Sequence, residues 1–321
     1  MNGINSFLEN VKEKLTAYYG DEYEVNICSV TKNNDHIRNG LTIRKRGENL
    51  APTIYLDEIY EEYLDGCSLE NITSKVIGLR AQCKDSIDVD VDFFTDYESV
   101  RDKLGIRLVS RERNRNLLKD VPHIDFADMS IIFNVKFAHD DIGNGSILIR
   151  NEHLSMWNIS LDRLYEDAKS AAVYREPPYL NDLINVMNDI FDKKGAHTWK
   201  DMRTDIKQQM ETMRDKRHNL FILTNQSKVD GAAVIAYPGM LQQLGEYLED
   251  DYFIIPSSIH EVLIVPMYAY DGDGKGLSLM VKEVNLTELD PEEVLSEHAY
   301  RYHRDTHWLE PVDVNIDNAG A

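Results

Sequence analysis

Short β-type runs alternate with amphipathic helical stretches along the whole chain, and this alternation restricts the fold more than any other feature. The first pair of runs is Tyr23–Val30 and Leu41–Arg44, and a second pair, Phe126–Phe137 and Ser146–Arg150, flanks a turn-rich loop. A third β-rich block holds Leu220–Thr224, Tyr252–Ile255 and Glu261–Val265. Because hairpins followed by helices build antiparallel sheet with helices on its faces, we predict an α+β fold of antiparallel hairpins covered by helices.

Apolar residues recur at helical spacing between these runs. An opening helix is predicted to carry Ile4, Phe7, Leu8, Val11, Leu15 and Tyr18 on one side. Ser68 and Ser160 have the residue type and position of N-caps for two further helices. Other predicted helices are Thr53–Gly66, Leu180–Phe191, Trp199–Met213 and Met240–Leu248, and a capping box at Asp290–Glu293 predicts one more helix start.

The acidic segment Lys84–Asp96 is the best candidate for a boundary between two lobes. We therefore predict an N-terminal α+β lobe over residues 1–90 and a main α+β domain over residues 91–308. Residues 309–321 hold three acids and no base, which is typical of a flexible acidic tail.

Charge restricts the class of partner. The chain has 56 acidic and 35 basic side chains, a formal net charge of −21, so we expect neither nucleic acid nor a membrane as partner. No stretch approaches the ~18 apolar residues of a membrane span, and the N-terminal MNGINSFLEN lacks the pattern of an export signal. Cys28, Cys67 and Cys83 form no CxxC pair, which favours reduced thiols and a cytoplasmic location.

The stretch SSIHEVLIVP contains a His-Glu pair like the one that begins a zinc-protease helix. Such a helix needs HExxH, but Ile264 stands four residues after His260, where the second histidine is required. Prolines bound the apolar run on both sides, and this pattern predicts a buried core strand. Ser258 and His260 lie two residues apart and would share one face at the entrance of that strand, so both are candidates for a catalytic site.

The stretch PHIDFADM places His123, Asp125 and Asp128 just before an apolar strand that contains Lys136. These residue types could serve a metal-dependent hydrolase with His260 as a further member, a hypothesis that requires the strands at 126–137 and 261–265 to be neighbours. A nuclease of the PD-(D/E)xK type would need an acid where Asn134 stands. Hydrogen bonds within a turn are the favoured interpretation of His123 and Asp125.

Two other acidic stretches lack an obligatory residue. Asp88, Asp90 and Asp92 are spaced two apart, which would put them on one face of a strand, as in metal-dependent nucleotidyl transferases. Those enzymes also need a Gly-Ser turn upstream, which is absent here, so a solvated linker is favoured. The stretch DGDGKG nearly begins a calcium loop, but Lys275 and Lys282 stand where oxygen ligands are required. A hairpin tip is predicted there.

Histidines gather near the end of the chain. His303 and His307 are four residues apart and His298 lies upstream, so a helix there could offer imidazoles to a metal. The sequence YRYHRDTHW fits a strand followed by a turn at least as well as it fits a helix. We predict no metal or other cofactor; if a metal binds, these three histidines are the candidate ligands.

Four stretches carry a family likeness: GLTIRKRGENLAPTIYLDEIYEEY, LLKDVPHIDFADMSIIF, GSILIRNEHLSMW and SSIHEVLIVP. In this order they resemble a family of uncharacterised proteins from gut Firmicutes, a domain-of-unknown-function family, from Phe7 to about His303. The end of the chain is also similar to the YtpQ-like family of Bacillus-type bacteria. The resemblance implies a bacterial, cytoplasmic α+β protein and carries over no catalytic residue.

Two hypotheses of function follow. The leading one is a non-enzymatic binding or protein-interaction module, because every catalytic pattern lacks a required residue. Tyr55, Tyr60 and Tyr63 fall on roughly one side of the predicted helix and are the candidate binding residues, although core packing explains them as well. The alternative is a metal-dependent hydrolase or nuclease that uses His123 and the two nearby aspartates. The sequence leaves the oligomeric state open.

Overall fold

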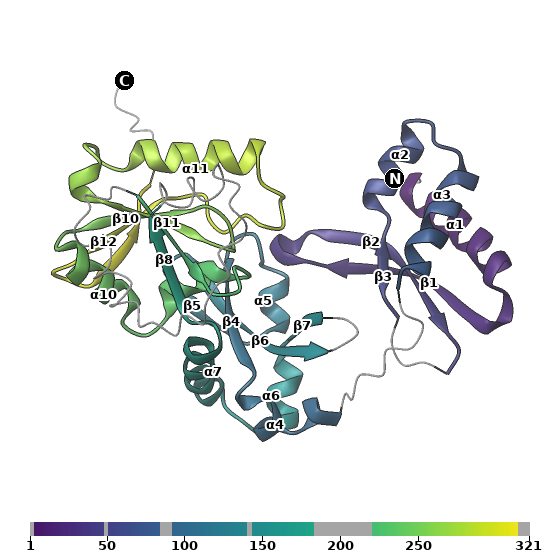
Figure 1. Ribbon diagram of the computed structural model, residues 1–321, viewed down its shortest axis with the longest axis horizontal. Helices are drawn as coiled ribbons and strands as arrows, with labels where there is room; N and C mark the ends of the chain where they lie inside the picture. Colours follow the sequence, from purple (N-terminus) through teal and green to yellow (C-terminus); the bar gives the residue numbers. More distant parts are fainter. Residues whose placement is uncertain (1–2, 48–50, 84–91, 140–142, 183–219, 314–321) are drawn as a thin grey trace, which may run out of the picture. The chain divides into compact units, whose positions relative to one another are not determined.

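The computed structural model describes residues 3–47, 51–83, 92–139, 143–182 and 220–313 (Figure 1). The chain divides into two compact units. We call them the N-terminal unit, Met1–Phe94 with Phe137–Gly145, and the C-terminal unit, Thr95–Lys136 with Ser146–Ala321. Most of the predicted boundary segment, residues 84–91, lies outside the described residues.

The N-terminal unit packs helices against an antiparallel sheet of strand order β1-β2-β3 (Figure 1). Its elements are α1 (Gly3–Tyr19), β1 (Tyr23–Thr31), β2 (Ile37–Lys45), β3 (Thr53–Tyr55), α2 (Asp57–Leu64) and α3 (Leu69–Ala81). Phe7, Leu8, Val11 and Leu15 of α1 are buried in one core with Leu41 and Ile43 of β2 and Val76 of α3, because spacing at 3.6 residues per turn puts them on one side of the helix. The predicted opening helix and first hairpin are confirmed, but Tyr18, predicted on the same side, is 63% exposed.

The predicted helix from Thr53 is wrong over its first residues, because Thr53–Tyr55 forms strand β3 and α2 begins only at Asp57. Contacts far away in the sequence decide this. Asn39 of β2 donates its backbone N–H to the Asp57 carboxylate at 2.9 Å, and Leu56 N–H donates to the Asn39 carbonyl at 2.8 Å. The next helix agrees with prediction, since the Ser68 hydroxyl accepts from the first turn of α3 at 3.2 Å.

The C-terminal unit holds most of a small antiparallel sheet in which β6 pairs with β4, β5 and β7. These strands are β4 (Leu104–Ser110), β5 (His123–Phe126), β6 (Met129–His139) and β7 (Gly143–Leu148). The helices around them are α4 (Tyr97–Arg101), α5 (Leu117–Asp120), α6 (Asn151–Trp157) and α7 (Leu161–Arg175). The predicted second hairpin is confirmed as β6–β7, and Ser160 is the N-cap of α7, accepting from Arg163 N–H at 3.2 Å.

A larger antiparallel sheet completes the C-terminal unit, in the order β13-β12-β10-β11-β9-β8. Its strands are β8 (Pro178–Asp182), β9 (Phe221–Asn225), β10 (Tyr252–Pro256), β11 (Val262–Pro266), β12 (Tyr300–His303) and β13 (Trp308–Pro311). Helix α11 (Lys275–Thr287) packs on the face that carries Phe253, Ile255 and Val265 (Figure 1). The Tyr252 hydroxyl donates at 2.8 Å to helix α10 (Met240–Leu248), which agrees with its predicted bounds.

Several predicted elements of this unit are wrong. The first three residues of the predicted helix at 180–191 lie in β8, which pairs with β9, whereas residues 183–191 and the predicted helix at 199–213 lie outside the described residues. No helix starts at Asp290, whose carboxylate accepts from Glu292 N–H at 2.9 Å in a turn. The first residues of the predicted tail form β13, and DGDGKG is no hairpin tip, because Gly274 is the left-handed N-cap of α11 (φ 82°).

All strand pairs described by the structure are antiparallel, and helices pack on the sheets, so the predicted α+β class is confirmed. None of the described helices has the length and apolar composition needed to cross a membrane.

Candidate functional site

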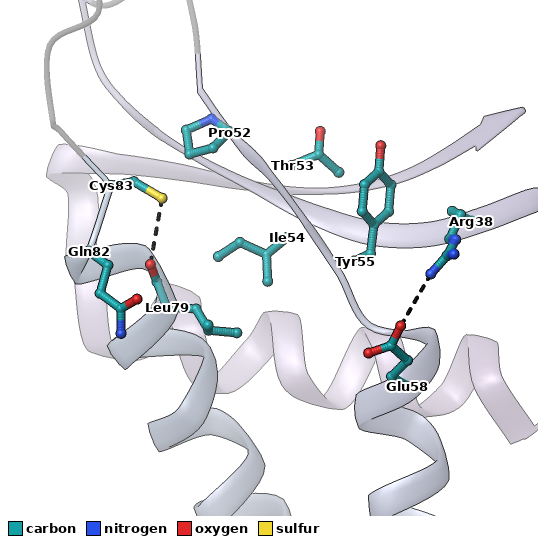
Figure 2. A pocket seen from close by; sticks show the side chains of 9 residues that line it. All are labelled: Arg38, Pro52, Thr53, Ile54, Tyr55, Glu58, Leu79, Gln82 and Cys83. Carbon is teal, nitrogen blue, oxygen red and sulfur yellow. Dashed lines mark hydrogen bonds and ion pairs between the residues drawn. The ribbon is translucent and has the colours of Figure 1, made fainter. Parts of the chain in front are cut away.

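A groove of about 450 Å³ lies in the N-terminal unit between strand β3 and the C-terminal end of α3 (Figure 2). We call it the β3 groove. It is lined by Arg38, Pro52, Thr53, Ile54, Tyr55, Glu58, Leu79, Gln82 and Cys83. These residues come from β2, β3, the first turn of α2 and the end of α3, so the folded unit brings together positions that are far apart in the sequence.

Close pairing of β2 with β3 forms one wall of the groove. Thr53, Ile54 and Tyr55 pair with Thr42, Leu41 and Gly40. A Cβ atom at Gly40 would lie 2.5 Å from the Ile54 carbonyl oxygen, so glycine is needed for the two strands to approach.

β3 is an edge strand, and its outer edge is free of partners among the described residues. The hydrogen bond from Leu56 N–H to the Asn39 carbonyl makes 39 and 56 a hydrogen-bonded pair. Because such pairs alternate along an antiparallel ladder, Leu41 and Ile54 form the next one. The backbone N–H and C=O groups of Thr53 and Tyr55 therefore point away from β2.

Polar side chains surround one end of the groove. The Arg38 guanidinium lies 3.5 Å from a Glu58 carboxylate oxygen, and the Glu58 side chain is 88% exposed (Figure 2). The Lys32 ammonium lies over the Tyr55 ring, 4.7 Å from its centroid. The Arg38 side chain is 20% exposed, so the Glu58 carboxylate is the accessible member of this pair.

The candidate tyrosines do not share one helical side, because Tyr55 belongs to a strand. Tyr60 and Tyr63 lie on α2, and their ring centroids are 5.1 and 5.0 Å from that of Phe7. They cover the edge of the core, and of the three candidates Tyr55 lines the groove.

The structure brings Ser258 and His260 together in the turn that joins β10 to β11. The His260 backbone N–H donates to Ser258 Oγ at 2.9 Å, and the His260 carbonyl accepts from Thr224 Oγ1 at 2.7 Å. His260 Nδ1 accepts from Asp230 N–H at 3.1 Å, so Nε2 carries the proton of the neutral ring and faces Glu293 at 3.7 Å. The serine hydroxyl thus contacts the main chain of His260, and the ring is held by two other segments.

This turn also packs closely against Gly231. A Cβ atom there would meet the His260 carbonyl and Thr224 Oγ1, and would lie 2.8 Å from Asn225 N. We expect Gly231→Ala to lower the free energy of unfolding by about 1–3 kcal/mol, because two of these atoms are backbone and cannot rotate away. Gly78→Ala is the control, since Gly78 lies within α3 with no neighbour that a Cβ would meet; about 0.5–1 kcal/mol of stabilisation is expected. Urea unfolding of both variants measures the difference, and equal effects would contradict this packing.

The three hydrolase candidates have separate partners. His123 Nδ1 lies 3.1 Å from the Val121 carbonyl, and Asp125 pairs with Arg111 at 3.2 Å. Asp128 accepts from the hydroxyl of Tyr300. Burial, and next the Asp128 charge, raise the pKa of that hydroxyl well above its ordinary value, so it stays a donor.

The strand that follows the three hydrolase candidates does not pair with the His260 strand. β6 belongs to the small sheet, whereas β11 pairs with β9 and β10 in the large sheet. The hydrolase hypothesis requires the two strands to be neighbours, and nothing in the described residues favours it.

The C-terminal histidines lie on β12 and in the loops on either side of it, not on a helix. His303 Nε2 lies 2.7 Å from Glu310, His307 Nδ1 lies 3.0 Å from the Tyr302 hydroxyl, and His298 lies 3.8 Å from Asp313. Within the described ranges, no three His, Cys, Asp or Glu side chains lie close enough together to hold a metal ion. Asp88 and Asp90 lie outside those ranges.

Sequence reasoning missed most of the groove. Arg38, Glu58 and Leu79 belong to no motif and come together only in the folded unit. A signal was present in Pro52 followed by Thr-Ile-Tyr, a β-type run just after a proline, which is typical of an edge strand.

Comparison with known proteins gives one match. The profile described as Family of unknown function (DUF5688) matches residues 4–304. No curated protein and no solved structure matches the chain. Since the match covers most of the sequence, the chain belongs to DUF5688, a family of unknown function.

Proposed function

We propose that this protein is a non-enzymatic binding module for other proteins and that the β3 groove is its binding surface. The observation that carries the proposal is the free edge of β3 inside a groove of about 450 Å³. Volumes of this size are typical of ligand pockets, and an exposed strand edge presents unpaired main-chain groups that another chain can bind.

A bacterial origin and a cytoplasmic location belong to the same proposal. The cytoplasmic location is supported by the three cysteines, Cys28, Cys67 and Cys83, each of which is a free thiol here. The likenesses to proteins of gut Firmicutes and to the YtpQ-like family stay predictions.

Site-specific photo-cross-linking in an extract of the source organism tests the proposed function. Gln82, an exposed residue that lines the groove, is replaced by benzoylphenylalanine. We expect a cross-linked protein that excess unlabelled protein removes by competition. The matched control carries the same group at Glu13, an exposed position on α1. The same products from both positions, or none from position 82, would contradict the proposal.

A further inference from the structure

We infer that the β3 groove binds an extended, basic segment of a partner protein, which adds to the N-terminal unit as a further strand beside β3. This inference rests on the proposed function and specifies the chemistry of the partner. Three features of the groove carry it: the outward main-chain groups of β3, an apolar floor and an acidic end.

The main-chain groups select an extended polypeptide. Thr53 and Tyr55 together direct two N–H donors and two C=O acceptors away from β2, and no other described element pairs with that edge. The two residues are about 7 Å apart along the strand, which matches alternate residues of an incoming strand. An incoming strand can therefore bond both residues at once, as in other cases of strand addition.

The apolar floor of the groove determines which side chains the bound segment needs on the side that faces it. Ile54 of β3 is buried, and Leu79 at the end of α3 is 36% exposed. Figure 2 places both side chains between β3 and α3. Because side chains alternate across a strand, every second side chain of the bound segment would face this floor, and apolar β-branched residues fit there.

The charge at one end selects a basic segment. The chain from Thr53 to Gly66, which forms β3 and α2, carries five acids and no base: Asp57, Glu58, Glu61, Glu62 and Asp65. Two bases, Arg38 and Lys32, also lie at this end, and the five acids outnumber them. The Glu58 carboxylate is 88% exposed and pairs with Arg38 at 3.5 Å. A lysine or arginine of the segment, placed beside the start of α2, would find an accessible carboxylate and a negative field from the rest of that helix.

Synthetic peptides test the inference with the full-length protein. The probe is a short fluorescent peptide of alternating valine and threonine with lysine at both ends, and binding is followed by fluorescence anisotropy. We expect the lysine peptide to bind about tenfold more tightly than the same peptide with glutamate ends. In the bound peptide, alternate backbone amides face β3 and the remaining amides face solvent. N-methylation of the amides that face solvent should be tolerated. N-methylation of the amides that face β3 removes their hydrogen bonds and should weaken binding by about tenfold or more.

Two protein variants locate the bound segment. Thr53→Pro removes one outward N–H group of β3 but keeps the Ile54–Leu41 pair. Glu58→Lys reverses the exposed charge, with Glu13→Lys on α1 as its control. We expect Thr53→Pro and Glu58→Lys each to weaken binding of the lysine peptide several-fold and Glu13→Lys to leave it unchanged. Circular dichroism checks that each variant is folded, and the N-methylated peptides need no variant at all.

The outcomes separate this inference from the proposed function. Equal binding of both N-methylated peptides, or equal binding of the lysine and glutamate peptides, overturns strand addition by a basic segment. If cross-linking at position 82 still captures a partner in that case, the binding module stands and only the mode of binding is wrong. If neither position 82 nor any peptide yields a complex, both proposals are wrong.

Discussion

Replacing Arg107 by alanine is expected to lower the free energy of unfolding by about 3–5 kcal/mol, because it leaves the Asp230 carboxylate buried without its cation. Asp230 is 3% exposed. Arg107 Nη2 donates to Asp230 Oδ2 at 2.9 Å, and Nε lies 2.9 Å from Oδ1 without the alignment of a hydrogen bond. The pair connects β4 of the small sheet to the residue before the buried 3-10 helix Gly231–Ala236.

A double variant without either charge separates the lost pair from other effects of the substitution. Arg107→Met with Asp230→Asn removes both charges, and asparagine tolerates the left-handed backbone of that residue (φ 55°). We expect the double variant to lose less stability than Arg107→Ala. Arg115→Ala is the surface control, since Arg115 and Glu112 are 73% and 81% exposed, and its change should stay within about 0.5 kcal/mol. Urea unfolding measures all three, and an Arg107→Ala loss no larger than the Arg115→Ala loss would count against a buried pair.

Ile264→Ala is expected to cost about 2–5 kcal/mol, the usual range for a large core side chain replaced by alanine. Ile264 is completely buried at the centre of β11 and pairs with Ile254 of β10 and Phe221 of β9. Both neighbouring strands hold the backbone in place, so the cavity cannot close by movement of the chain.

His260→Ala is the comparison for Ile264→Ala. The His260 side chain is 33% exposed and accepts one hydrogen bond from the main chain, so its loss should cost about 1 kcal/mol. Thermal melts with metal quantified on each variant decide the order. A larger loss from His260→Ala, accompanied by loss of a bound metal, would restore the zinc-site interpretation of SSIHEVLIVP.

The sequence by itself determined the elements whose signal is local. Periodic apolar residues fixed α1 and α10, because helical spacing alone puts their buried side chains on one face. Serine N-caps marked the starts of α3 and α7, since a cap satisfies the free N–H groups of the adjacent turn. The apolar run of SSIHEVLIVP between prolines identified β11 as a buried strand.

Only the tertiary structure decided the elements and the site that depend on distant partners. Thr53–Tyr55 falls within a predicted helix and is a strand because Gly40 lets β2 approach it. Leu180 looks helical and is a strand because β9 pairs with it. The capping box at Asp290 makes only a turn, since a local hydrogen bond can form without a helix behind it. The β3 groove has no sequence motif for the same reason: its residues come from four elements, and only chain packing places them around one free strand edge.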